Sequence, residues 1–282
     1  MKILHVISSL DKGGAETHLA MLLKSQCKTH NVKVLYFKGN SFWKKEILKY
    51  GAKVHLIKLT KIYNLSNFIS AYFKIKKIIL DFKPDIVHGH LSTSELILAI
   101  LKFFNKKVFK LVITKHLDSF FFEGSFGKNT FFKGIFVDKF IFTFSDRIIF
   151  ISEFTKKYFL EKIKTPNKKF KKIYYGFNNK FYRNTKDYKK RLHKLINYKN
   201  KDFILSNISR HVKQKSINIF IKALYILKVK YHFNPKAIIV GKGPETNKLK
   251  NYAKKLELNK NIFWIENYIN IKDIYNITDL FV

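Results

Sequence analysis

The sequence predicts an α/β protein built from two domains. Short runs rich in β-branched residues alternate with amphipathic helical segments along most of the 282 residues, and this alternation is typical of a parallel sheet with helices on both faces. A lysine- and asparagine-rich segment at 178–201 interrupts the alternation, which resumes at 203. Because this segment is poor in aliphatic residues, it predicts a linker between an N-terminal domain, 1–177, and a shorter C-terminal domain, 202–282.

In the N-terminal domain the patterns predict strands at 2–8, 32–37, 53–57, 85–89, 109–114 and 147–151, with helices that include 15–28 and 66–82. The second helix ends before Pro84, because the residue that precedes a proline is disfavoured in the α conformation. In the C-terminal domain they predict a strand at 203–208, a helix at 216–230, a strand at 236–240, a helix at 245–256, a strand at 261–265, a helix at 271–277 and the opening of a last strand at 280–282.

Composition restricts the protein class. The most apolar region, 131–151, is interrupted by charged residues and is no membrane span, and the N-terminus shows no signal-peptide pattern. We therefore expect a cytoplasmic protein. Cys27 is the single cysteine, which excludes disulfide frameworks and cysteine metal clusters.

The formal net charge of +37 invites a nucleic-acid-binding interpretation. However, only four of the 56 basic residues are arginine, the side chain whose planar fork suits phosphates and bases. The lysines fit an anionic membrane surface better, on the inner face of the cytoplasmic membrane. The phenylalanine- and lysine-rich region 119–144 suits such an interfacial element, and it equally suits the ordinary core of a helix and the following strand.

A glycine pair, Gly13-Gly14, follows the first predicted strand and opens a helix. Main-chain N–H groups at such a junction can face a phosphate at the carboxyl edge of a sheet. A turn that needs glycine for its backbone conformation explains the same pair. The pair alone does not decide between these two interpretations.

Two loops of the C-terminal domain carry further candidate phosphate-binding features. Arg210 and Lys215 lie between a strand and a helix, where cations could clamp a diphosphate and stabilise it as a leaving group. Gly241, Gly243 and Pro244 end the next strand, and positions without side chains there would let a nucleotide approach the backbone. A plain turn explains these glycines equally well.

Two histidines follow buried strands of the N-terminal domain. His90 and His116 are predicted at the same carboxyl edge as the glycine pair, as catalytic or as hydrogen-bonded structural residues. The sequence has no carboxylate cluster with metal-ligand spacing, no Gly-x-Ser-x-Gly elbow and no Walker loop. Hydrolase and ATPase interpretations therefore lack support.

Taken together, these segments resemble the family 4 glycosyltransferases of the GT-B fold, which have two Rossmann-like domains facing each other. In chain order, the resemblance is carried by Gly13-Gly14-Ala15-Glu16, Pro84-Asp85-Ile86-Val87-His88-Gly89-His90, Thr114-Lys115-His116, Ile151-Ser152-Glu153-Phe154-Thr155, Gly176-Phe177-Asn178 with Phe181, Arg210 with Lys215, Gly241-Lys242-Gly243-Pro244 and Asp279-Leu280-Phe281-Val282.

The resemblance implies transfer of a sugar from a nucleotide-sugar donor to a cell-envelope glycan or lipid-linked acceptor, with retention of anomeric configuration. It implies no metal and no other cofactor. His116 would approach the transferred sugar, and Glu16 and His90 would lie on the acceptor side. The donor site that it implies comprises Gly13, Gly14, Arg210, Lys215, Gly241, Gly243 and Pro244. We expect these residues to converge on one cleft between the domains.

The chain also departs from the family pattern. Ser209 and Ser216 stand where the family usually has glycine, Tyr175 stands for asparagine and Asn178 for aspartate. The family's Glu-x7-Glu segment would come after Val282, so the second Rossmann-like domain is expected to be incomplete at its C-terminus and the chain to have little transferase activity. The alternatives are a truncated remnant that binds a sugar nucleotide or a membrane without turnover, and a lysine-rich nucleic-acid-binding protein.

Overall fold

The computed structural model describes residues 1–282 except 60–63, 117–129, 164–166, 177–201 and 267–270. The chain divides into two compact units, Met1–Gly176 and Phe177–Val282, and each is described by itself. The predicted linker at 178–201 lies outside the described residues.

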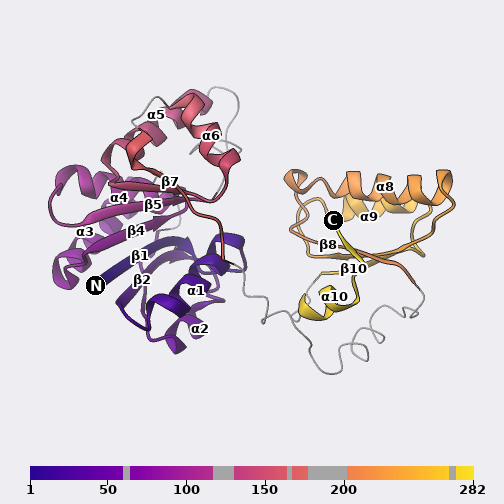
Figure 1. The fold of residues 1–282 in the computed structure, drawn as a ribbon, viewed down its shortest axis with the longest axis horizontal. Helices are drawn as coiled ribbons and strands as arrows, with labels where there is room; N and C mark the ends of the chain where they lie inside the picture. The colour runs from indigo at the N-terminus through magenta and orange to yellow at the C-terminus, as the bar shows by residue number, and fades with distance from the viewer. Residues whose placement is uncertain (60–63, 117–129, 164–166, 177–201, 267–270) are drawn as a thin grey trace. The chain divides into compact units, whose positions relative to one another are not determined.

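The first unit contains a parallel sheet of seven strands in the order β3-β2-β1-β4-β5-β6-β7 (Figure 1). Its strands are β1 Lys2–Ser9, β2 Asn31–Lys38, β3 Lys53–Leu56, β4 Ile86–His90, β5 Lys110–Lys115, β6 Arg147–Phe150 and β7 Phe170–Lys172. Neighbouring strands pair in parallel throughout. The predicted parallel sheet is confirmed, and it aligns the carboxyl ends of β1, β4 and β5 at one edge.

Helices cover both faces of this sheet. They are α1 Gly14–Gln26, α2 Lys44–Lys49, α3 Leu65–Phe82, α4 Ser92–Phe104, α5 Thr130–Phe144 and α6 Glu153–Lys162. Alternate residues of a strand point to opposite faces. Accordingly, Val34 packs in the α1–α2 core and Leu35 in the core that contains α3, α4 and α5. As predicted, α3 ends before Pro84, where Lys83 takes a left-handed conformation with φ 50°.

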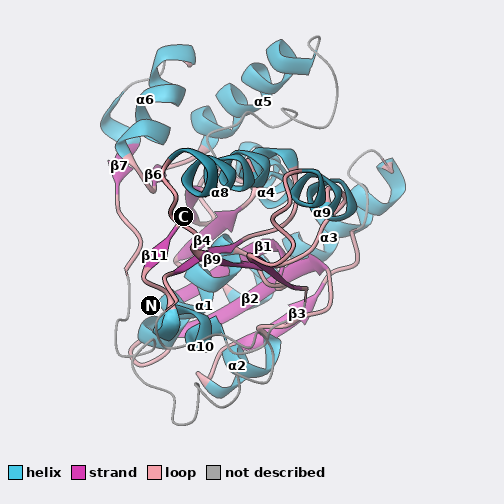
Figure 2. Cartoon of the chain, turned by 90° about the vertical axis from the view of Figure 1, so that its right-hand side faces the viewer, coloured by secondary structure: helices cyan, strands magenta, loops and turns pink. Residues whose placement is uncertain are grey.

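The second unit has a parallel sheet in the order β10-β9-β8-β11, formed by β8 Ile204–Ile208, β9 Lys236–Val240, β10 Ile262–Ile265 and β11 Leu280–Phe281. Helices α8 Ile217–Lys230 and α9 Thr246–Lys255 lie side by side over one face (Figure 2). Helix α10 Ile271–Ile277 packs its Ile274 against the other face. A short 3-10 turn, Lys213–Lys215, precedes α8.

The aromatic region 119–144 lies only partly within the described residues. Its helical part, α5, buries Phe142 in the core of the first unit, whereas Phe136 is exposed and Phe140 and Phe144 are half-buried. Residues 119–129 lie outside the described part. Across the described residues, we find no helix that combines the length and the hydrophobicity needed to cross a bilayer.

Candidate functional site

The junction of β1 and α1 forms the first part of the site. Gly13 is the N-cap residue of α1 and Gly14 begins the helix. The Glu16 carboxylate folds back over this turn, where it accepts a hydrogen bond from the Ser9 hydroxyl at 2.5 Å and occupies the space that a Cβ at Gly13 would need. At Gly14, by contrast, a Cβ would meet open space in the described structure. Gly14 thus leaves open space at the N-terminal end of α1, the end of a helix that favours anions.

Histidines of three neighbouring strands form a cluster that extends from within the sheet to the same edge. His5 of β1 is in register with His88 of β4, His90 ends β4, and His116 follows the last residue of β5. Residues two apart in a strand share a face, so the two β4 histidines both lie beside the ring of His5. The ring centroids of His88 and His90 are 4.1 Å apart, and those of His90 and His116 are 5.3 Å apart.

A continuous chain of hydrogen bonds runs through three of these rings. His5 Nε2 lies 2.8 Å from Gln26 Oε1, and His5 Nδ1 lies 3.1 Å from His90 Nε2. His90 Nδ1 lies 3.0 Å from His116 Nε2, and His116 Nδ1 is hydrogen-bonded to the Tyr175 hydroxyl. The chain therefore connects the last residue of α1 with a tyrosine at the carboxyl edge of the sheet.

Burial keeps the imidazoles neutral. Desolvation is the largest cause that lowers the pKa of His5 to about 4 and that of His116 to about 3. The pKa values of His88 and His90 also lie well below the usual range, first through burial and then through the neighbouring histidines. Each neutral ring has one N–H donor and one acceptor nitrogen.

Three of these histidines also have the composition of a metal site. The ligand nitrogens of His5, His88 and His90 lie within 4.8 Å of one another, and neutral imidazole is the form that binds metals. Both nitrogens of His5 and His90 are nevertheless hydrogen-bonded, and His88 Nε2 lies 2.7 Å from the Thr114 hydroxyl. A metal would have to displace these bonds. The expected absence of a metal stays a prediction.

Helix α1 brings a further histidine to His116. The His18 ring stacks on Tyr175, with centroids 4.1 Å apart and planes at 16°, and its centroid lies 5.8 Å from that of His116. Burial lowers the pKa of His18, and burial together with the charge of Glu16 raises the pKa of Tyr175 to about 12. The phenol therefore remains protonated and can act as a hydrogen-bond donor.

A buried ion triad anchors the strand end that presents His116. Lys115 Nζ lies 2.8 Å from Glu95 Oε2 on α4 and 2.8 Å from Asp138 Oδ1 on α5. Burial opposes the charge of the ammonium, but the two carboxylates outweigh it, so the pKa of Lys115 is raised. Burial is also the main cause that raises the pKa of Glu95. The triad ties the end of β5 to both helices.

In the second unit, the loops after β8 and β9 carry the predicted donor residues. Arg210 and Lys215 are exposed, and neither side chain has a hydrogen-bond or ion-pair partner among the described residues. Main-chain bonds hold the two loops together: Ser209 N donates to Val240 O at 3.0 Å and His211 N donates to Lys242 O at 3.2 Å. This places Arg210 beside the glycine turn.

Close packing of these loops explains the two glycines. Gly241 has φ 129°, and a Cβ there would overlap the carbonyl oxygen of Ser209. A Cβ at Gly243 would overlap the carbonyl oxygen of His211. The sequence left two explanations of these glycines open, approach of a nucleotide and a plain turn, and in the structure the neighbouring loop is a sufficient reason for them. Pro244 is exposed next to this turn.

A buried histidine lies at the base of the two loops. The Thr246 hydroxyl donates its proton to Gly243 O at 2.8 Å and accepts hydrogen bonds from Gly243 N and His211 Nδ1, each at 2.9 Å. His211 therefore carries its proton on Nδ1. Its Nε2 is buried and has no partner among the described residues. This nitrogen is an unused acceptor close to the predicted donor loops.

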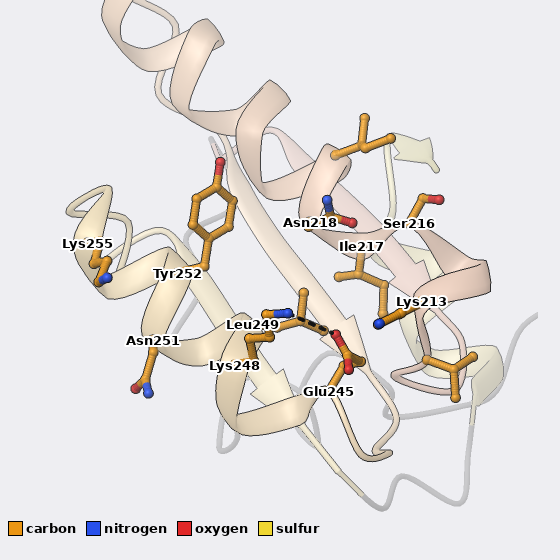
Figure 3. Close-up of a pocket in the computed structure, with 12 residues that line it drawn as sticks. Lys213, Ser216, Ile217, Asn218, Glu245, Lys248, Leu249, Asn251, Tyr252 and Lys255 are labelled. Carbon is orange, nitrogen blue, oxygen red and sulfur yellow. Dashed lines mark ion pairs between the residues drawn. The ribbon is translucent and has the colours of Figure 1, made fainter.

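An open pocket of about 960 Å³ lies next to these loops, between α8 and α9 (Figure 3). Lys213 and Ser216 line it on one side, and Glu245 and Lys248, which form an ion pair at 3.9 Å, line it on the other. Arg210, Lys215 and the two glycines do not line it. The pocket is thus a neighbour of the predicted donor loops and not their centre.

The structure brings the predicted residues together in two sets, one in each unit. In the first unit His90 bonds to His116, and α1, which begins at Gly14, lies beside His116 through His18. In the second unit the loops of Arg210 and Gly241 pack together. Convergence of both sets on one interdomain cleft stays a prediction.

Sequence reasoning assigned no site role to several members of the first set, which are His5, His18, Gln26, His88, Glu95, Asp138 and Tyr175. A signal existed for the β1 and β4 members. His5 lies inside a predicted buried strand, and His88 and His90 are two apart in another. Polar residues at such positions require buried partners.

The comparisons with known proteins agree with this fold. The family model described as Glycosyltransferase Family 4 matches residues 12–181, and the model described as Glycosyl transferases group 1 matches residues 189–282. The chain is also 28% identical over 118 residues to GalNAc-alpha-(1->4)-GalNAc-alpha-(1->3)-diNAcBac-PP-undecaprenol alpha-1,4-N-acetyl-D-galactosaminyltransferase of Campylobacter jejuni. That match covers 41% of this chain and 32% of the length of the curated relative.

Solved structures match over the whole chain. The Anabaena protein Alr3699/HepE, in complex with UDP and glucose, has a TM-score of 0.81 at 20% identity, and 73% of its chain is covered. WaaG, a glycosyltransferase involved in lipopolysaccharide biosynthesis, has a TM-score of 0.69 at 14% identity, with 74% of its chain covered. Both matches span 100% of this chain and confirm the expected GT-B class of fold.

Proposed function

Since the chain belongs to glycosyltransferase family 4, we propose that it transfers a sugar from a nucleotide-sugar donor to a glycan acceptor, with retention of anomeric configuration. The observation that carries the proposal is the pair of exposed cations after β8, Arg210 and Lys215, next to the tightly packed glycine turn after β9. Charge-assisted bonds from such cations would bind the donor diphosphate and stabilise it as it leaves.

We propose UDP as the nucleotide of the donor. The structurally similar Anabaena protein was solved with UDP and glucose, and this supports a uridine nucleotide here. The unused Nε2 of His211, close to Gly241, is an acceptor that an N–H donor of a ligand could satisfy. In the first unit, His116 is the side chain that would contact the transferred sugar.

For the acceptor we propose a lipid-linked glycan at an anionic membrane surface. The name of the Campylobacter relative describes an undecaprenol-linked acceptor, which supports this class. Two exposed large apolar residues, Phe104 at the end of α4 and Phe136 on α5, and the exposed cations Lys106, Lys107 and Lys110 after α4 are candidate contacts for it. Apolar side chains among lysines bind anionic interfaces.

Calorimetric titration with UDP tests the donor site. Arg210→Ala and Lys215→Ala should each weaken binding by about 1.5–3 kcal/mol, because each removes a charge-assisted contact. Lys213→Ala, in the same exposed turn, is the matched control and should change affinity far less. Equal losses in all three variants would mean that bulk positive charge and not a site binds the nucleotide.

A second measurement tests turnover. The chain is incubated with UDP-sugars and a polyprenyl-diphosphate glycan, and sugar transfer and the anomeric configuration of the product are measured. Transfer that is lost in Arg210→Ala supports the proposal. UDP binding without any transfer would instead favour a sugar-nucleotide-binding protein without turnover.

A further inference from the structure

The direction of every hydrogen bond in the histidine chain follows from its first member. The Gln26 carbonyl oxygen can only accept, so His5 Nε2 carries the proton and donates to it at 2.8 Å. In neutral His5, Nδ1 is then the acceptor and receives a bond from His90 Nε2. His90 Nδ1 in turn accepts from His116 Nε2. One proton placement therefore sets the next along the whole chain.

We propose that His5 and His90, anchored by Gln26, are positioning residues that hold His116 in the tautomer with its proton on Nε2. The remaining nitrogen, Nδ1, is then an acceptor, and in the free protein it receives the bond of the Tyr175 hydroxyl. Resting on the proposed function, the inference adds the chemistry of recognition: His116 accepts a hydrogen bond from a hydroxyl group of the sugar.

The surroundings of the chain make the opposite tautomer of His116 unfavourable. His5 and His90 have no exposed surface, so water cannot replace a lost partner. Moving the proton of His116 to Nδ1 would leave two acceptor nitrogens facing each other, or would require every ring and the Gln26 amide to reverse together. Unpaired buried acceptors are costly, and linked bonds of this kind reinforce one another.

Histidine ¹⁵N NMR of the ligand-free protein tests the proposal, because protonated and unprotonated ring nitrogens resonate in separate ranges. The signals of His116 are identified by their loss in His116→Asn. In the wild-type chain, His116 should show a protonated Nε2 and an unprotonated Nδ1. The measurement needs no donor or acceptor, so its outcome is independent of sugar transfer.

Three variants test whether the hydrogen-bond chain, and not another contact in the histidine cluster, sets the tautomer of His116. Gln26→Leu removes the anchor and should convert His116 to a mixture of tautomers. Thr114→Val is the matched control, since it removes the hydrogen bond of His88, which lies in the cluster but outside the chain, and should leave His116 unchanged. Tyr175→Phe removes the hydroxyl that is hydrogen-bonded to His116 Nδ1 at the other end of the chain, and it should also preserve the tautomer.

A protonated Nδ1 on His116 in the wild-type chain would overturn the proposal. So would an unchanged tautomer in Gln26→Leu, or a tautomer that changes in Tyr175→Phe, because either result would mean that the chain does not set it. If Gln26→Leu fails to fold, the wild-type and Tyr175→Phe spectra still decide. A wild-type tautomer as expected, together with absent sugar transfer, would contradict only the proposed function.

Discussion

Replacement of Lys115 by methionine tests the ion triad that anchors the end of β5. The Lys115 side chain is 3% exposed, and its ammonium lies 2.8 Å from both Glu95 and Asp138. Methionine keeps much of the volume of the stem but removes the ammonium that lies between two buried carboxylates. Removing one partner of a buried ion pair typically costs about 3–5 kcal/mol. We therefore expect the free energy of unfolding of the first unit to fall by about this amount.

Lys110→Met is the matched control, because it changes the same residue type at the other end of the same strand. Lys110 is 74% exposed and lies 3.6 Å from Asp146. Exposed pairs of this kind contribute at most about 1 kcal/mol. The expected difference between the two variants is thus several-fold.

Urea unfolding followed by tryptophan fluorescence measures both variants. The chain has two tryptophans, Trp43 in the first unit and Trp264 in the second. In a Trp264→Phe background, the signal of Trp43 therefore reports the first unit alone. Equal destabilisation by Lys115→Met and Lys110→Met would refute the reasoning, because burial would then not determine the strength of the pair.

The pH dependence of Lys115→Met gives a second check. Burial raises the pKa of Glu95 even beside its lysine, so without the lysine the folded variant should bind a proton more tightly than the unfolded chain. A group whose pKa is raised by folding stabilises the fold at low pH and loses this contribution as pH rises. The defect of the variant should therefore be smaller at about pH 5 than at about pH 7.5. A defect that does not depend on pH would contradict a role for the carboxylates.

Two other predictions concern the histidines and the glycines. The pKa of His5 is lowered to about 4 and that of His116 to about 3, so below the unfolded value near 6.5 the unfolded chain binds more protons than the folded chain. As pH falls from about 6.5 towards these values, the free energy of unfolding should decrease by up to about 1.4 kcal/mol per pH unit for each histidine. Urea unfolding at a series of pH values measures this decrease, and a flat profile would contradict buried neutral rings. Gly241→Ala should destabilise the second unit, because its Cβ meets Ser209 and its φ is 129°. Gly14→Ala should not lower thermal stability, because its Cβ meets open space at the first position of a helix. A loss of UDP affinity in Gly14→Ala without a loss of stability would then support donor phosphate at this position, and unchanged affinity would count against it.

The sequence predicted the strands and long helices closely, and the reason is their hydrophobic pattern. Strand β9 was predicted at 236–240 and is Lys236–Val240, and α3 was predicted at 66–82 and is Leu65–Phe82. The prediction did not include β7, Phe170–Lys172, or α2, Lys44–Lys49. Elements this short contain less than two turns or a single buried residue, so tertiary contacts and not their own pattern determine them.

The site was predicted less completely, because its residues come together only through the register in which neighbouring strands pair. A histidine inside a strand carries little information until the neighbouring strand is known. The pairing of His5 with His88 in register brings His90 within hydrogen-bond distance of His5. The sequence contained these residues, but the positions along β1 and β4 at which they meet come from the sheet.

Two of the residues that depart from the family pattern have local roles that the structure makes visible. Ser216, where glycine is usual, has φ 48° and ψ 32°. That left-handed conformation costs an L residue about 1–2 kcal/mol but costs glycine little, which explains why glycine suits this position. In this chain the loop keeps the left-handed conformation although the residue is a serine. Tyr175, where asparagine is usual, bonds to His116 Nδ1. A phenol hydroxyl and a side-chain amide have in common a proton to donate. With Nδ1 of His116 as an acceptor, the Tyr175 hydroxyl supplies its hydrogen-bond donor in the free protein, while the tautomer itself is set from the Gln26 end of the chain.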